Sequence, residues 1–223
     1  MSRLTKIISS IPKTIWFNLR YLPFLTAIRL PVWVASNVRI KCMERGVIRL
    51  TNNVKPGLIR IGYHEADAVD TYGLHTILSI EKGGEFIFTE DAHIGHGAII
   101  NIKSTGTLSV GRNFAISGTT SIICNKSIKF GDDVQTSWNS LITDSDAHKI
   151  FSEDGNQINP NMEIIIGNNV WIAANTTILK GSVISDNTVV ASNSLVNKKF
   201  TQGKCIIGGS PANVIKSIGY FKI

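Results

Sequence analysis

Cysteine is scarce in this chain of 223 residues. The three cysteines, Cys42, Cys124 and Cys205, are odd in number, lie far apart and form no Cys-x-x-Cys pair. This arrangement excludes a disulfide framework and favours a reducing compartment. We therefore expect a cytoplasmic protein whose cysteines are small buried or half-buried residues.

Long apolar runs are also missing. No run reaches the length of a membrane-spanning helix. A signal peptide is not expected, because Arg20 and Arg29 interrupt the apolar N-terminal region and no small-residue cleavage site stands out. The runs of Gly and Asn lack the strand-loop-helix frame of a dinucleotide fingerprint or phosphate-binding loop, so they indicate neither.

Acidic residues are absent from the first 43 positions, whose seven basic residues supply the whole net charge of +7. The rest of the chain is neutral overall, so the high pI does not indicate a nucleic-acid-binding protein. Residues 1–35 are also apolar and aromatic, and Ser9 or Ser10 with Pro12 in the first turn predicts the start of a helix. Two interpretations stay open: an arm lying on the anionic cytoplasmic face of the inner membrane, or a cap packed on the body or on a neighbouring subunit.

The chain does contain a repeat of six residues between positions 166 and 196. An aliphatic residue returns at each sixth position: Ile166, Ile172, Ile178, Ile184, Val190 and Val196. Six is not a multiple of 3.6, so no α-helix keeps these residues on one face. A short strand followed by a polar turn fits each repeat, and stacked parallel strands give a solenoid with an aliphatic core. Imperfect copies predict earlier coils, at Phe88, Ile94 and Ile100, and at Val110, Ile116, Ile122 and Ile128.

This pattern resembles the hexapeptide-repeat acyltransferases, in their polysaccharide and sugar O-acetyltransferase branch. The resemblance implies an all-β fold, a left-handed parallel β-helix preceded by a short, partly helical segment. We expect an arm over residues 1–45, the β-helix over 46–216 and a tail over 217–223. The resemblance also implies a homotrimer with active sites between neighbouring subunits, and acetyl-CoA as co-substrate.

A polar loop at residues 143–163 abandons the repeat and contains His148. The segment Asp-Ser-Asp-Ala-His resembles the Asp-x-Asp-x-His of sugar O-acetyltransferases, in which the histidine is the general base. By this resemblance His148 would deprotonate a sugar hydroxyl that attacks the thioester directly, and Asp146 or Asp144 would orient the imidazole. The alternative is a solvated loop histidine without a catalytic role.

Two further segments resemble the acetyl-CoA site of the family. They are N-N-V-W-I-A-A-N, which has Ala173 where the family often has Gly, and the ending V-N-K-K with G-G-S-P-A. The resemblance assigns to acetyl-CoA binding Trp171, Ala173, Ala174, Ala191, Lys198, Gly209 and Pro211. Trp171 can also serve turn packing, and Lys198 can equally be a solvated charge.

The expected acceptor is a sugar hydroxyl of a surface polysaccharide (capsule, O-antigen or exopolysaccharide) or of its precursor. Maltose- and galactoside-type relatives use an asparagine to bind the acceptor, but this chain has Gly118–Thr119 in that region, so a different acceptor pocket is expected. Three alternatives stay open: a nucleotide-sugar N-acetyltransferase, a metalloenzyme resembling the γ-class carbonic anhydrases, and a non-catalytic scaffold. His93 and His96 lie close in sequence, but a third metal ligand has no candidate, and no metal is expected.

Overall fold

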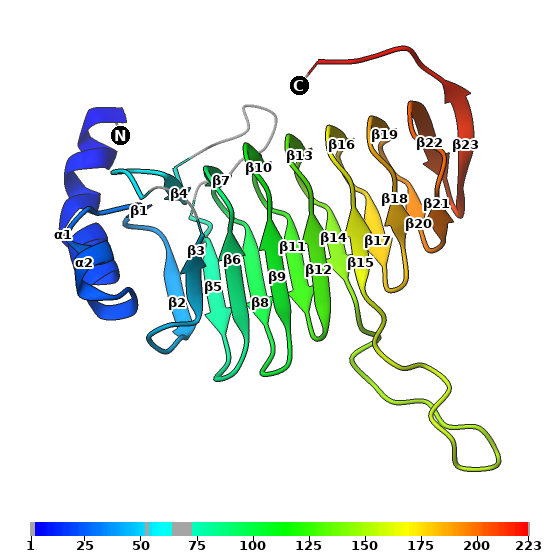
Figure 1. Ribbon diagram of the computed structural model, residues 1–223, viewed down its shortest axis with the longest axis horizontal. Helices are drawn as coiled ribbons and strands as arrows, with labels where there is room; N and C mark the ends of the chain where they lie inside the picture. The colour runs from blue at the N-terminus through cyan, green and yellow to red at the C-terminus, as the bar shows by residue number, and fades with distance from the viewer. Residues whose placement is uncertain (1–2, 52–53, 64–72, 223) are drawn as a thin grey trace.

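The computed structural model describes residues 3–51, 54–63 and 73–222. Two helices, α1 (Arg3–Tyr21) and α2 (Phe24–Ala27), precede a body of short strands. Figure 1 shows the helices across one end of a row of stacked strands, with a long loop projecting from the body. No helix of the described residues is long and apolar enough to cross a membrane.

The strands form three sheets, and all neighbouring strands pair in parallel except the last pair of sheet A. Sheet A contains β1 (Val32–Val34), β4 (Ile59–Ile61), β7 (Ala92–Ile94), β10 (Phe114–Ile116), β13 (Val134–Thr136), β16 (Val170–Ile172), β19 (Thr188–Val190), β22 (Cys205–Gly209) and β23 (Ala212–Ser217). Sheet B contains β2 (Arg39–Cys42), β5 (Ile77–Ile80), β8 (Ile99–Ile102), β11 (Ser121–Cys124), β14 (Leu141–Thr143), β17 (Thr177–Leu179) and β20 (Leu195–Val196). Sheet C contains β3 (Ile48–Leu50), β6 (Glu85–Phe88), β9 (Thr107–Val110), β12 (Ser127–Phe130), β15 (Ile164–Ile166), β18 (Val183–Ile184) and β21 (Lys199–Phe200).

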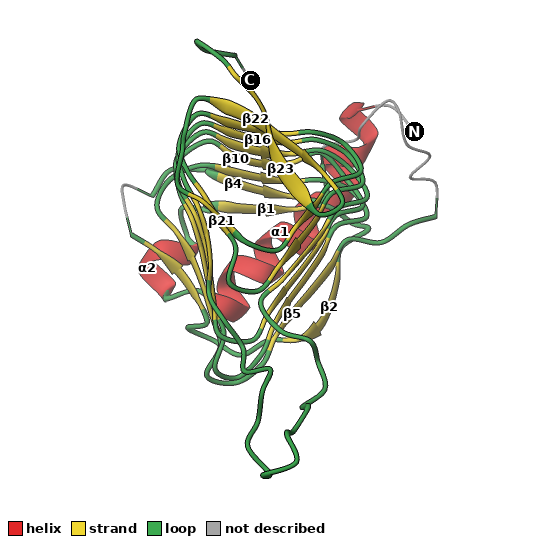
Figure 2. Cartoon of the chain, turned by 90° about the vertical axis from the view of Figure 1, so that its right-hand side faces the viewer, coloured by secondary structure: helices red, strands yellow, loops and turns green. Residues whose placement is uncertain are grey.

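The chain visits sheets A, B and C in turn, so three consecutive strands make one coil of a parallel β-helix. Figure 2, viewed along the stack, shows the three sheets around one interior. The predicted repeat is confirmed by burial, because its aliphatic side chains all point inward and are at most 1% exposed: Ile166, Ile172, Ile178, Ile184, Val190 and Val196. The stacked aliphatic columns are the hydrophobic core.

The corner between sheets C and A repeats one backbone feature. The residue just before successive strands of sheet A has a positive φ, between +50° and +57°: Asn113, Asp133, Asn169, Asn187 and Lys204. Asparagine and aspartate tolerate this left-handed conformation better than most residues. The Asn-rich turns of the sequence are therefore the corners of the coil.

Helix α1 covers the open edge of β1, the first strand of sheet A. Thr14 Oγ1 accepts a hydrogen bond from Val34 N–H at 3.0 Å, and Asn18 Nδ2 donates to the Val32 carbonyl at 2.6 Å. Ser10 Oγ accepts the N–H of Ser36 at 3.0 Å. One buried face of the helix thus replaces a missing strand, which protects an exposed sheet edge.

The sequence interpretation of this N-terminal segment needs two corrections. The helix begins at Arg3, and Pro12 lies inside it, so the expected capping by Ser9 or Ser10 is wrong. Both serine hydroxyls instead donate to the Lys6 carbonyl within the helix. The expected boundary at residue 45 falls inside the first coil, because β1 and β2 already pair with the strands of the next coil.

Candidate active site

The loop of residues 144–163 leaves the body where sheet B meets sheet C, between β14 and β15. Its ends lie together, since Met162 N–H donates to the Asp144 carbonyl at 3.1 Å. The carbonyl of Met162 accepts from Gly181 N–H on the next coil at 3.3 Å. Figure 1 shows the loop extending well beyond the corners of the coils. The rigid body therefore fixes both ends of the loop, and its outer part projects into the surroundings.

A short antiparallel ladder stiffens the outer part of this loop. Ile158 N–H donates to the Ile150 carbonyl at 2.9 Å, and Phe151 and Gln157 form a bridge. Ile150, Phe151 and Ile158 are between 52% and 61% exposed. Apolar side chains that are ordered but uncovered are typical of a surface that contacts another molecule.

His148 lies on a tight turn near the start of the loop. Its backbone N–H donates to the Asp146 carbonyl at 2.7 Å, and Ala147 between them has a φ of +64°. A three-residue turn with a positive φ at an alanine is a strained conformation that the surroundings must hold in place. The His148 side chain is exposed. The turn thus presents the imidazole at the surface beside the corner.

The side chain of Asp146 anchors the turn to the next coil. Its Oδ2 accepts from Lys180 Nζ at 2.5 Å and from Asn159 Nδ2 at 2.9 Å. Asn159 also donates to the His148 carbonyl at 2.8 Å and accepts the N–H of Ile150 at 2.7 Å. The hydrogen bond from Lys180, and next that from Asn159, lower the pKa of the Asp146 carboxyl. Asp146 is therefore ionised near neutral pH and holds the turn at both sides of His148.

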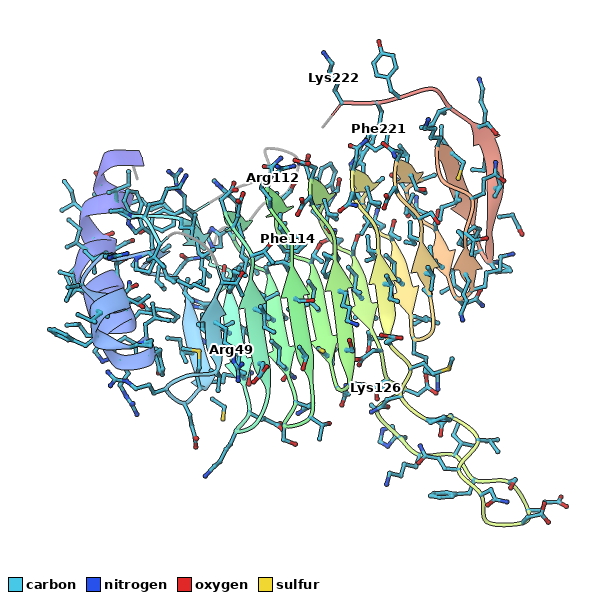
Figure 3. The ribbon with its side chains drawn as sticks, in the orientation of Figure 1. Arg49, Arg112, Phe114, Lys126, Phe221 and Lys222 are labelled. Carbon is cyan, nitrogen blue, oxygen red and sulfur yellow. The ribbon has the colours of Figure 1, made fainter. Side chains whose placement is uncertain are left out.

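Asp144 is placed differently from Asp146, although only Ser145 separates them. Its side chain is fully buried and accepts the backbone N–H groups of Asn125, Lys126 and Ser127 at 2.7, 2.8 and 2.8 Å. Figure 3 labels Lys126, the middle residue of that turn, near the start of the loop. Both carboxylate oxygens are thus used to stabilise the corner of the preceding coil.

The thiol of Cys124 faces the same carboxylate, with Sγ at 3.7 Å from Asp144 Oδ2. Burial, and next the charge of Asp144, raise the pKa of this thiol to about 12. Cys124 is therefore a protonated weak donor, as expected of a small buried residue rather than of a nucleophile.

The residues assigned to acetyl-CoA lie mostly at a different corner, where sheet A meets sheet B. Ala173 and Ala191 occupy the same corner position on successive coils, because Ile172 pairs with Val190. Ala173 and Ala174 are buried, at 6% and 8% exposure, whereas Ala191 is half-buried and Gly209 is exposed. The accessible part of this edge is therefore formed by the last coil and by the turn that follows it.

Trp171 and Lys198 lie outside that corner. The Trp171 side chain projects from the outer face of sheet A, is 41% exposed and donates from Nε1 to Ser137 Oγ at 3.2 Å. Lys198 follows β20, and its Nζ donates to Asn213 Oδ1 at 2.6 Å and lies 5.5 Å from the centre of the Phe200 ring. Pro211 is exposed in the turn between β22 and β23, after a cis peptide bond.

One chain does not bring all the predicted site residues together. The turn with His148 follows a strand of sheet B, at its junction with sheet C. Ala173 and Ala191 follow strands of sheet A and Gly209 ends one, at or beside the junction with sheet B. The two groups of residues thus lie at opposite edges of sheet B.

Comparison with known proteins decides the family. The bacterial transferase hexapeptide family (six repeats) matches residues 163–198. Galactoside O-acetyltransferase of Escherichia coli (strain K12) is 30% identical over 155 residues, which cover 64% of this chain and 75% of the relative. The chain belongs to the hexapeptide-repeat bacterial transferases.

Other relatives agree with this assignment. The polysialic acid O-acetyltransferase of Neisseria meningitidis is 34% identical over 97 residues, which cover 43% of this chain and 45% of the relative. The crystal structure of the polySia-specific acetyltransferase NeuO has the same fold, with a TM-score of 0.57 and 21% identity over 86% of this chain and 90% of that chain. This hexapeptide-repeat transferase is therefore an acetyltransferase, and its sugar-modifying relatives support O-acetyl transfer.

Lys180 and Asn159 of this hexapeptide-repeat transferase were missed by sequence reasoning. The repeat contained a signal for Lys180. Ile142 and Ile178 stack on successive coils, and Lys180 lies two positions after Ile178, just as Asp144 at the start of the loop lies two positions after Ile142. Asn159 carried no comparable signal, since it lies in the loop outside the repeat.

The alternative hypothesis of a metalloenzyme concerns the histidines of the earlier coils. His96 is 9% exposed, and its Nε2 lies 2.8 Å from the Leu74 carbonyl oxygen. His93 belongs to β7, and His64 lies outside the described residues. Among the residues that the structure describes, no three His, Cys, Asp or Glu side chains are grouped as metal ligands.

Proposed function

We propose that this enzyme transfers an acetyl group from acetyl-CoA to a sugar hydroxyl of a surface polysaccharide or its precursor, in the cytoplasm. The observation that carries the proposal is the exposed imidazole of His148 on a strained turn that Asp146, Lys180 and Asn159 fix to the solenoid. Strained backbone held by surrounding contacts is concentrated at functional sites. The sugar-modifying relatives support this class of acceptor.

In the proposed reaction His148 is the general base. The acceptor hydroxyl gives its proton to the imidazole while its oxygen attacks the carbonyl carbon of the thioester. The carbon–sulfur bond breaks, and the departing thiolate of CoA takes up the proton from His148. Asp146 is a positioning residue, because its carbonyl and carboxylate hold the turn rather than the reacting atoms. Asp144 has a structural role in this proposal, because its oxygens bind the turn of residues 125–127.

We place the acetyl-CoA along the edge between sheets A and B of the last coils. Ala191 and Gly209 are accessible there and small, so an extended pantetheine can approach the backbone. Trp171 and Lys198 can contribute through an exposed ring and an exposed positive charge. The Lys198 ammonium would serve as a point charge for phosphate after exchanging its present contact with Asn213.

The donor and acceptor parts of the site would meet between subunits of a homotrimer. The outer face of sheet B supports this assembly, because it carries a series of half-buried aliphatic side chains: Ile77, Ile99, Ile123, Leu141, Leu179 and Leu195. The outer face of sheet C is more polar, with Arg49, Lys129 and Lys199 exposed. An aliphatic sheet face beside an exposed apolar loop is the surface that a second copy would bury.

This assembly gives a test of the shared site. Sizing with light scattering is expected to give three chain masses, and Leu179→Glu should yield monomers with little acetyl transfer, because a charge enters the apolar face. Ile165→Glu on the outer face of sheet C is the matched control and should keep both trimer and activity. A native monomer with full activity would contradict the shared site.

The proposed reaction is tested with purified enzyme, acetyl-CoA and a panel of acceptors. The panel contains galactosides, sialic acid oligomers, capsular and O-antigen fragments, and amino sugars. We expect release of free CoA thiol that depends on a hydroxyl acceptor, with one acetyl ester found by mass spectrometry and removed by mild alkali. Alkali-stable acetylation of an amino sugar alone would overturn O-acetyl transfer, and absence of acetyl-CoA binding by calorimetry would overturn the donor.

A further inference from the structure

Helix α1 has an exposed apolar face in addition to the face that caps the solenoid. Its side chains are spaced by three or four residues and are therefore on one side of the helix: Ile8, Ile11, Ile15 and Leu19. Each is between 41% and 58% exposed. The buried face instead uses residues such as Ser10, Thr14, Phe17 and Asn18. The apolar face is thus not required for the packing of α1 on β1.

Helix α2 continues this apolar surface. Phe24 and Leu25 are 65% and 74% exposed, and Ile28 just beyond the helix is 56% exposed. Figure 1 shows both helices together at the outer end of the stack, with the body of the β-helix on one side only. We call the exposed apolar side chains between Ile8 and Ile28 the apolar end. A patch of this kind on a soluble body marks an interaction surface.

The positive charge of this segment indicates which kind of partner can bind the apolar end. Residues 1–43 contain seven basic residues and no acidic one. Arg20 and Arg29 are exposed and follow directly in sequence the exposed Leu19 and Ile28. Two copies that met through this end would bring two groups of positive charge together, which opposes association. An anionic surface with an apolar interior offers both kinds of complementary contact.

We propose that the apolar end of residues 8–28 docks on an anionic lipid bilayer, with α1 lying in the headgroup region. The Ile8 to Leu19 face and the α2 side chains enter the boundary of the acyl chains, and Arg20 and Arg29 contact lipid phosphates. The buried face keeps its bonds to β1, so docking needs no release of the cap. This inference does not depend on the identity of the acetyl acceptor.

Trp16 provides a local probe of this docking. It is 48% exposed on α1, and its ring packs edge-on against Tyr21 with centroids 5.6 Å apart. Its fluorescence emission should shift to shorter wavelength when vesicles of phosphatidylcholine with phosphatidylglycerol are added, because the indole leaves water. Trp16→Phe should remove the shift and leave the signal of the other tryptophans unchanged. An identical shift in this variant would overturn the proposed orientation.

Vesicle co-flotation tests the docking itself. The full-length enzyme is expected to bind vesicles with phosphatidylglycerol, to bind those of phosphatidylcholine alone weakly, and to dissociate as salt rises. Leu19→Ser, Phe24→Ser and Leu25→Ser together should weaken binding by about tenfold or more, because exposed apolar area is lost. Val214→Ser with Ile215→Ser, at the other end of the solenoid and also exposed, should not.

Equal binding by the triple variant and wild type would overturn the proposal. Failure of the wild-type enzyme to bind anionic vesicles would also overturn it. A smaller assembly mass for the triple variant in light scattering would then show that a second copy covers the apolar end. Acetyl transfer to a short water-soluble acceptor should be the same in wild type and variant. A loss of docking is thereby distinguished from a failure of the proposed reaction.

Discussion

Replacement of His148 by alanine is expected to lower kcat by about 10²- to 10⁴-fold, the usual contribution of a positioned general base. Stability should not change, because the side chain is exposed on a loop that backbone and Asn159 contacts hold. The measurement is the rate of CoA thiol release at saturating acetyl-CoA and acceptor, with the urea unfolding midpoint recorded for the same preparation.

Lys149→Ala is the matched control for His148→Ala. It removes the adjacent exposed side chain from the same loop and should keep wild-type turnover. His148→Ala with wild-type kcat would remove the general base from the proposal. Loss of binding of acetyl-CoA rather than of turnover would instead place His148 in donor binding.

Replacement of Asp144 by alanine is expected to destabilise the fold by about 3 to 5 kcal/mol, because it removes a fully buried carboxylate and leaves three backbone N–H groups without their charged acceptor. Asp144→Asn should lose less, since one acceptor oxygen is retained. The measurement is urea unfolding followed by far-ultraviolet circular dichroism. The fraction that folds should keep most of its turnover per molecule.

Asp146→Ala is expected to keep its stability and to lose turnover, the reverse of Asp144→Ala. Its half-exposed ion pair with Lys180 contributes at most about 1 kcal/mol to stability, so the unfolding midpoint should hardly move. Turnover should fall, because the turn that presents His148 loses its anchor to the next coil.

Two results would contradict the structural role of Asp144. If folded Asp144→Ala lost turnover as His148→Ala does, Asp144 would be catalytic. If Asp144→Ala unfolded at the same urea concentration as wild type, the structural role of Asp144 would be wrong.

The contrast between Asp144 and Asp146 shows which side-chain positions at this site can be predicted from the sequence. Ile142 faces the core and Thr143 faces outward, so strand alternation alone points the Asp144 side chain inward. The backbone partners of Asp144 belong to a turn 17 to 19 residues earlier in the chain, and only the stacking of coils brings them together. Asp146, beyond the end of the strand, has no such periodic constraint, and its contacts depend on how the loop folds back onto Lys180.

For the N-terminal segment, too, the sequence alone could not predict which contacts its side chains make. Its composition predicted a basic, apolar element and left open whether that element caps the body or lies on a membrane. The structure shows that α1 has one face for each kind of contact: Ser10, Thr14 and Asn18 complete the edge of β1, and the Ile8 to Leu19 face points away. A helix presents several faces at once, so the composition of the segment could not assign them.

The sequence by itself determined a solenoid of stacked short strands, because a six-residue return of aliphatics is incompatible with one face of an α-helix, and the family resemblance of the repeat made that solenoid a parallel β-helix. It also located the loop and its histidine, since both interrupt a strict repeat. Only the tertiary structure decided which residues hold that histidine and that Ala173, Ala191 and Gly209 lie at the other edge of sheet B. Contacts between coils join residues that are distant in sequence, and no local period records which loop residue will reach across them.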